Sequence, residues 1–113
     1  MASEIKMVRG TSRTFRISVT DAEGRPYNML DGEKLIFGVK KQTSDEELLV
    51  CKVVRECIDG VCVVELDPED TVNLEVGKYY YDVGLESGAD YFNVVALSVF
   101  NLTANITKRG DGV

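Results

Sequence analysis

The sequence predicts an all-β protein built as a sandwich of about six or seven strands. Apolar and polar residues alternate with a period of two along most of the chain, whereas the spacing of an amphipathic helix is nearly absent. Turn-forming glycine and proline residues separate the alternating segments at short intervals. Short alternating strands joined by turns are typical of two packed antiparallel sheets.

The first two strands are expected at residues 13–20 and 34–41. Each has a single apolar face, as a strand that is buried on one side requires. The residues expected to face inward are Phe15, Ile17, Val19, Leu35, Phe37 and Val39. A turn over residues 21–26, which contains Gly24 and Pro26, ends the first strand.

A hairpin is expected next, with strands at 47–58 and 61–67 joined by Asp59-Gly60. Asp-Gly between two runs of strand-forming residues is a strong hairpin signal, because both positions of the turn need positive φ. A two-residue loop would place Cys57 opposite Cys62 and continue the pairing toward the other ends of both strands.

One face of this hairpin is expected to join the core, with Arg55 as its polar exception. Its other members are Leu49, Cys51, Val53, Cys57, Cys62, Val64 and Leu66.

A short helical turn at 68–74 is predicted to carry the chain from one sheet to the other. Pro68 suits a first helical position, and acidic residues follow it. Strands at 78–86 and 91–103 complete the pattern, the former with Tyr79, Tyr81, Val83 and Leu85 on one face. We expect one domain over residues 1–113, with an ordered core at about 4–107 and a flexible tail at 108–113.

Composition excludes several classes of function. The 113 residues include 13 Lys and Arg against 19 Asp and Glu, a net charge of −6, which argues against nucleic-acid binding. The chain has no histidine, so Ser-His triads and imidazole metal sites are excluded. No apolar run is long enough for a membrane helix, and the first residues lack the apolar stretch of a signal peptide. We therefore expect neither an enzyme nor a membrane protein. A small hydrolase would need two carboxylates facing each other in a cleft.

The three cysteines allow two interpretations. A disulfide between Cys57 and Cys62 is geometrically conceivable in the expected hairpin. Alternatively, both are small buried apolar residues in a reducing cytosol. Cys51 stays unpaired in either case. A thiolate zinc site needs four ligands, so no metal and no cofactor are expected.

Apolar side chains on both faces of a strand indicate that both faces are covered, by this chain or by another. The hairpin's second face carries Val50, Val54, Val61 and Val63, and the last strand has no polar face. Tyr80 is expected to project outward from its strand. We predict an interface at these five residues, with a homo-oligomer as one consequence.

The segment Val64–Leu85 resembles small immunoglobulin-like β-sandwich modules in structural proteins of tailed phages and prophages. The match is carried by the block from Pro68 to Asp82, with its Gly-x-Tyr-x-Tyr-Asp pattern, and by Phe100–Thr103 in the last strand. Arg9-Gly10-Thr11 before the first strand and the Lys-Lys pair that ends Ile36–Lys41 also fit. The three cysteines are not part of the family pattern.

This resemblance implies an immunoglobulin-like antiparallel β-sandwich without chemistry of its own. It implies a tail, baseplate or fibre component of a virion, made in the bacterial cytoplasm, whose partners are other virion proteins or copies of itself. The alternative is a bacterial immunoglobulin-like module that binds a surface or a carbohydrate.

Overall fold

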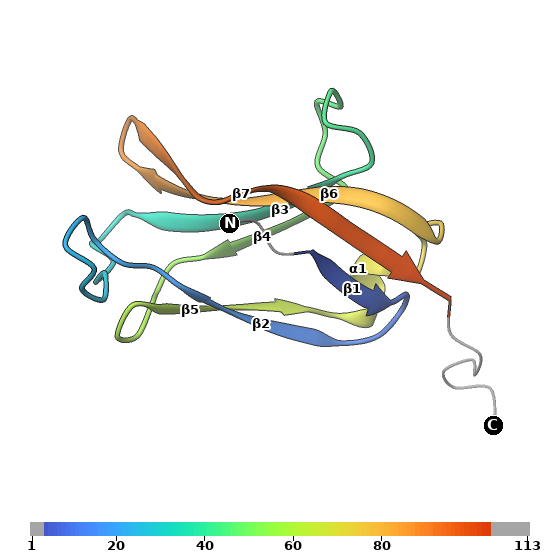
Figure 1. The fold of residues 1–113 in the computed structure, drawn as a ribbon, viewed down its shortest axis with the longest axis horizontal. Helices are drawn as coiled ribbons and strands as arrows, with labels where there is room; N and C mark the ends of the chain where they lie inside the picture. The colour runs from blue at the N-terminus through green and yellow to red at the C-terminus, as the bar shows by residue number, and fades with distance from the viewer. Residues whose placement is uncertain (1–3, 105–113) are drawn as a thin grey trace.

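The computed structural model describes residues 4–104, which form two β-sheets packed face to face and one short helix (Figure 1). The strands are β1 (Ile5–Val8), β2 (Arg13–Ser18), β3 (Lys34–Lys40), β4 (Val50–Val54), β5 (Val61–Leu66), β6 (Gly77–Ser87) and β7 (Asp90–Thr103), and the helix is α1 (Pro68–Thr71).

The strand order defines an immunoglobulin-like sandwich. One sheet has five strands in the order β1-β7-β6-β3-β4, and the other pairs β2 with β5. The strands β3, β6 and β7 correspond to the three-stranded sheet of such domains, and β4 widens it as in the variable type. Among the strands of residues 4–104, only β1 is parallel to its neighbour, β7. The predicted fold class is therefore confirmed.

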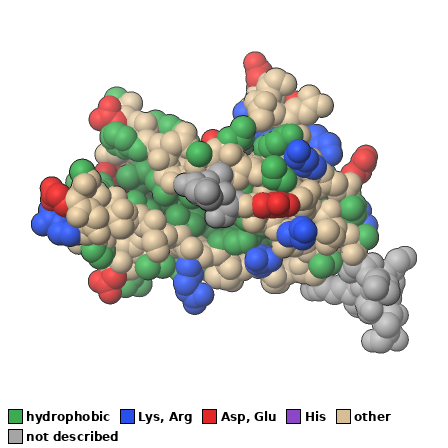
Figure 2. Space-filling model, in the orientation of Figure 1, with side chains coloured by type: hydrophobic (Ala, Val, Ile, Leu, Met, Phe, Trp, Pro, Cys, Tyr) green, Lys and Arg blue, Asp and Glu red, His purple; other side chains and the backbone are tan. Residues whose placement is uncertain are grey.

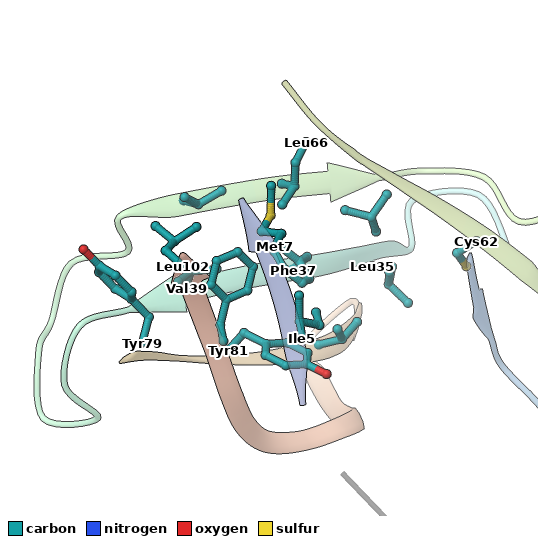
Figure 3. Packing of buried hydrophobic residues seen from close by; sticks show 14 of the residues in the cluster. Ile5, Met7, Leu35, Phe37, Val39, Cys62, Leu66, Tyr79, Tyr81 and Leu102 are labelled. Atoms are coloured by element: carbon teal, nitrogen blue, oxygen red, sulfur yellow. The ribbon is translucent and has the colours of Figure 1, made fainter. Parts of the chain in front are cut away.

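The core lies between the two sheets, where the inward faces predicted for β2, β3 and β6 meet. Phe37 is 1% exposed and lies at the centre of a chain of aromatic contacts. Ring centroids are 5.9 Å apart between Phe15 and Phe37, 5.5 Å between Phe37 and Tyr81, and 6.4 Å between Tyr81 and Phe100. Figure 3 shows Phe37 and Tyr81 side by side, with Leu35 and Val39 along the same strand as Phe37. The contact between Phe15 of β2 and Phe37 of β3 joins the two layers.

The entry into β6 has the tyrosine corner that is typical of immunoglobulin-like domains. Tyr79 is buried, and its hydroxyl donates a hydrogen bond to the Glu75 carbonyl oxygen at 2.7 Å. Burial, and next the negative charge of Glu75, raise the pKa of the Tyr79 hydroxyl. The bond ties the connection after α1 to the start of β6.

Replacing Tyr79 by phenylalanine is expected to lower the free energy of unfolding by about 1 kcal/mol, because one buried hydrogen bond is lost without a change in packing. Urea unfolding measures this. Tyr80→Phe is the control, because no hydrogen bond joins the Tyr80 hydroxyl to the described residues; an equal loss in both variants would contradict the role of the corner.

A buried carboxylate organises the connection between β2 and β3. Glu33 is 6% exposed and accepts hydrogen bonds from the Leu30 backbone N–H at 2.7 Å and from the Tyr27 hydroxyl at 2.8 Å. The Leu30 bond, followed by one from the Ser87 side chain, lowers the pKa of Glu33, and burial opposes them. The bond to Glu33, above all, raises the pKa of Tyr27.

Because the pKa of Glu33 is lower in the folded state, its contribution to stability is present above about pH 4.5 and is lost as the pH falls through the folded value. We expect the melting temperature to fall in acid, and to fall less in Glu33→Gln, which also melts lower at pH 7. Thermal melts from pH 3 to pH 7 check this. Parallel curves for the two proteins would contradict it.

The hairpin predicted between 47–58 and 61–67 has the expected turn, but the prediction that its two strands pair with each other is wrong. Asp59 and Gly60 both have positive φ, of 51° and 77°, and Ile58 forms a bridge with Val61. Beyond that bridge the strands part, because β4 pairs with β3 and β5 pairs with β2. The segment 55–60 crosses between the layers, so that β4 and β5 belong to different sheets.

The core face predicted for this segment is therefore correct in β5 and wrong in β4. Cys62, Val64 and Leu66 are buried, whereas Leu49 and Val53 are 46% and 45% exposed. Pairing with β3 turns the opposite face inward, so that Val50 and Val54 face the core and Cys51 is exposed.

The remaining elements follow the prediction more closely. The helical turn is the shorter α1, after which the chain passes from the two-stranded sheet to the five-stranded sheet. Cys57 and Cys62 form a disulfide across the Asp59-Gly60 turn, with Cα atoms 4.4 Å apart, so the disulfide interpretation holds. The sequence did not predict β1. The expected tail at 108–113 lies outside the described residues.

Candidate functional site

A groove of about 360 Å³ crosses the outer face of the five-stranded sheet, and we call it the outer groove. In Figure 1 this face is the upper surface, between the β3–β4 loop and the β6–β7 turn, both of which project from it. The lining residues are Ile36, Gly38 and Lys40 of β3, Thr43, Glu46 and Leu48 of the following loop, Tyr80, Tyr81 and Asp82 of β6, and Tyr91 and Leu97 of β7.

Two glycines allow larger side chains to pack closely against the strands of this face. A Cβ atom on Gly38 would lie 2.8 Å from a methyl carbon of Leu48. A Cβ atom on Gly84 would overlap the ring of Tyr91. Glycine at these two strand positions therefore gives Leu48 and Tyr91 their places, as expected where another group approaches a strand closely.

The groove combines exposed apolar groups with a few charges. Leu48, Tyr91 and Leu97 are 41%, 53% and 56% exposed. Burial first, and then the negative charges of Asp82 and Glu86, raise the pKa of the Tyr91 hydroxyl. This hydroxyl is therefore protonated at neutral pH and can donate a hydrogen bond to a ligand. Such a mixture of apolar and charged groups is suited to binding a protein surface or a carbohydrate.

Tyr80 also belongs to this face. It lines the outer groove, as its predicted outward direction requires, and the Lys78 ammonium group lies 5.5 Å from the centre of its ring. This contact holds the Tyr80 ring in place and puts a positive charge beside the groove.

The four valines of the predicted interface do not form one surface with Tyr80. Val50 is 4% exposed and Val54 packs against the core, both on the inner side of the five-stranded sheet. Val61 is half-buried and Val63 is 42% exposed, both in β5 of the other sheet. The prediction grouped them because it placed β4 and β5 in one hairpin. Contact of Val63 with another molecule stays a prediction.

Sequence reasoning did not assign Leu48, Tyr91 or the two glycines of the outer groove to an interface. A signal was present, because Gly38 and Gly84 interrupt strands and such glycines often mark close approach by another group. Leu97 belongs to the two-sided apolar strand that did indicate a covered surface.

Between residues 4 and 104, no group of three or more Cys, Asp or Glu side chains is arranged to hold a metal ion. Within the same residues, no helix has the length and hydropathy to cross a membrane.

The strand order thus defines the chain as an immunoglobulin-like domain. Among solved structures it is similar to one described as "Tim-1", with 13% identity and a TM-score of 0.47, covering 96% of this chain and 98% of that chain. It is also similar to the NK cell receptor Nkp44, with 18% identity and a TM-score of 0.46, covering 93% of this chain and 99% of that one. No family model and no curated protein matches the sequence.

Proposed function

We propose that this domain is a non-catalytic assembly module of a tailed phage or prophage virion, in its tail, baseplate or fibre, and that it binds its neighbours through the outer groove. The neighbours are other virion proteins or copies of the chain itself. The observation that carries the proposal is the set of three exposed apolar side chains, Leu48, Tyr91 and Leu97, that surround one groove. The resemblance of Pro68–Asp82 to phage modules supports the setting.

The energies are adequate for a specific contact. Full burial of one large apolar side chain contributes about 1.5–3 kcal/mol, so three of them supply several kcal/mol before the costs of association. Tyrosine is also enriched among the residues that dominate binding energy at interfaces. Lys40 and Asp82 line the same groove and would select the orientation of a partner by charge.

The proposed location is the virion, after synthesis in the bacterial cytoplasm. The net charge of −6 supports a protein partner over nucleic acid, whose phosphates require a basic surface.

The test uses the bacterial strain that carries the gene. After prophage induction and density-gradient purification, mass spectrometry is expected to find the chain in the particle fraction. Leu48→Asp should reduce its incorporation by about tenfold or more, since it places a charge where about 1.5 kcal/mol or more of apolar burial is expected.

Val63→Asp is the matched control, because Val63 is 42% exposed and Leu48 is 41% exposed, but Val63 lies in the two-stranded sheet and Leu48 lies in the β3–β4 loop against the five-stranded sheet. The Val63→Asp variant should be incorporated into particles normally. Circular dichroism should show that both variants are folded. Absence of the chain from particles would overturn the virion role. Loss of incorporation in Val63→Asp alone would move the interface to the two-stranded sheet.

A carbohydrate-binding module is the second candidate, and two of the tyrosines that line the outer groove favour it. Tyr80, which is half-buried, and Tyr91, which is exposed, line the groove together with Asp82, and aromatic rings beside a carboxylate can bind a sugar. A glycan array separates the candidates. Glycan binding that Tyr91→Ala abolishes would favour the second, and an array without binding would favour the first.

A further inference from the structure

A second opening lies between the two sheets, and we call it the inter-sheet slot. Its volume is about 520 Å³. Figure 2 shows hydrophobic side chains in the recess between the two layers, left of the grey atoms, where Figure 1 places β7 above and β2 below. The lining residues are Ile5, Phe15, Arg16, Ile17, Ser18, Phe37, Tyr81, Val83, Asn93, Val94, Val95 and Ala96. The two-stranded sheet is too narrow to cover the wider one here, so part of the core is open to solvent.

One wall of the slot is an unpaired strand edge. Among the described strands, β2 pairs only with β5. The Val19 N–H donates to the Gly60 carbonyl oxygen at 2.7 Å, on the β5 side. Backbone groups of successive residues point to opposite sides of a strand, so Phe15 and Ile17 also bond toward β5. The N–H and C=O groups of Thr14, Arg16 and Ser18 therefore point to the free edge, and Arg16 and Ser18 line the slot.

The opposite wall is also an unpaired edge. The short β1 pairs with β7 only from Phe100 to Thr103. The segment Asn93–Ala96, which lines the slot, lies before that paired part and has no neighbour on its outer side among the described strands. Two sheet edges without partners thus face one apolar recess.

We propose that the inter-sheet slot receives one extended strand of a second polypeptide, which pairs with the free edge of β2 and inserts alternate apolar side chains into the recess. A strand fits better than a helix or a small apolar ligand, because only a strand satisfies the exposed backbone groups while covering Phe15 and Ile17. The six residues of β2 give an edge of about 20 Å.

Charge adds a preference for the partner. No acidic side chain in the described part of the chain forms an ion pair with Arg16, which lines the slot. An acidic residue at a solvent-facing position of the incoming strand would pair with it. The partner segment is therefore expected to be apolar at every second position and acidic between them.

The test uses synthetic nine-residue peptides in which valine or isoleucine alternates with threonine and glutamate. Added to the full chain, at least one of these peptides is expected to slow hydrogen exchange of the Thr14, Arg16 and Ser18 amides by about tenfold or more. The same peptides with N-methyl groups on the edge-facing amides should not. The amides of Val63 and Glu65, on the far edge of β5, should be unaffected.

Arg16→Pro removes one edge donor without removing a bond to β5, and proline is accepted at such edge positions. It should weaken peptide binding by about tenfold or more. Glu65→Pro is the matched control on the opposite edge and should bind as the natural sequence does. If Arg16→Pro unfolds, the exchange pattern of the natural sequence decides alone.

No protection by any of the peptides, or equal protection by the N-methylated ones, would overturn the proposal. The slot is a different surface from the outer groove, so Leu48→Asp should leave peptide binding unchanged. If no peptide binds in the inter-sheet slot, the proposed function is therefore unaffected. If the virion test fails, the proposal for the slot is likewise unaffected.

Discussion

Replacing Phe37 by alanine is expected to lower the free energy of unfolding by about 3–5 kcal/mol, the range measured for large-to-small changes at well-packed sites. Phe37 is 1% exposed, and its ring contacts those of Phe15 and Tyr81 from the two sheets. Its loss leaves a cavity between the layers that neither sheet can close without breaking its own ladder. For a domain of this size, that is a large part of the total stability.

Denaturant unfolding followed by circular dichroism measures the effect. Phe92→Ala is the matched control, because Phe92 lies in the same sheet and is 55% exposed. Its change should stay below about 1 kcal/mol. Similar losses in the two variants would mean that the aromatic contacts do not hold the sandwich together.

Reduction of the disulfide between Cys57 and Cys62 is expected to lower the free energy of unfolding by about 2 kcal/mol. The bond closes a loop with a sequence separation of 5, and the chain-entropy model gives a cost of that size for so short a loop. The disulfide also holds the turn at Asp59-Gly60, where the chain crosses between the sheets, because no ladder joins β4 and β5.

Thermal unfolding with and without dithiothreitol measures this contribution. The double variant Cys57→Ala, Cys62→Ala should be insensitive to the reductant, which excludes an effect through the exposed Cys51. An unchanged melting temperature of the natural chain after complete reduction would show that the bond adds nothing to stability.

Much of the fold could be predicted from alternation, because a strand buried on one side carries its pattern in its own residues. Leu35, Phe37 and Val39 are examples, and all three are buried. Pairing between strands could not be predicted in the same way. Asp59-Gly60 specifies a turn, but whether the flanking residues continue as a ladder depends on which other strands compete for them, and here β2 and β3 do.

The candidate site was less accessible to sequence reasoning for the same physical reason. Tyr80 could be placed on the outer face by alternation alone. The outer groove also depends on Leu48 over Gly38 and on Tyr91 over Gly84, contacts between residues of different elements. The strand β1 has only four residues and includes Lys6, a pattern too short to distinguish from a loop.

Hydroxyl-radical footprinting of the chain, free and in purified particles, tests the central claim most directly. If the domain works by contact through the outer groove, Leu48, Tyr91 and Leu97 are oxidised several-fold less in the particle. Leu30 and Ile58, which are 66% and 70% exposed and lie outside the groove, should react equally in both states. Equal oxidation of the three groove residues in both states would contradict the claim.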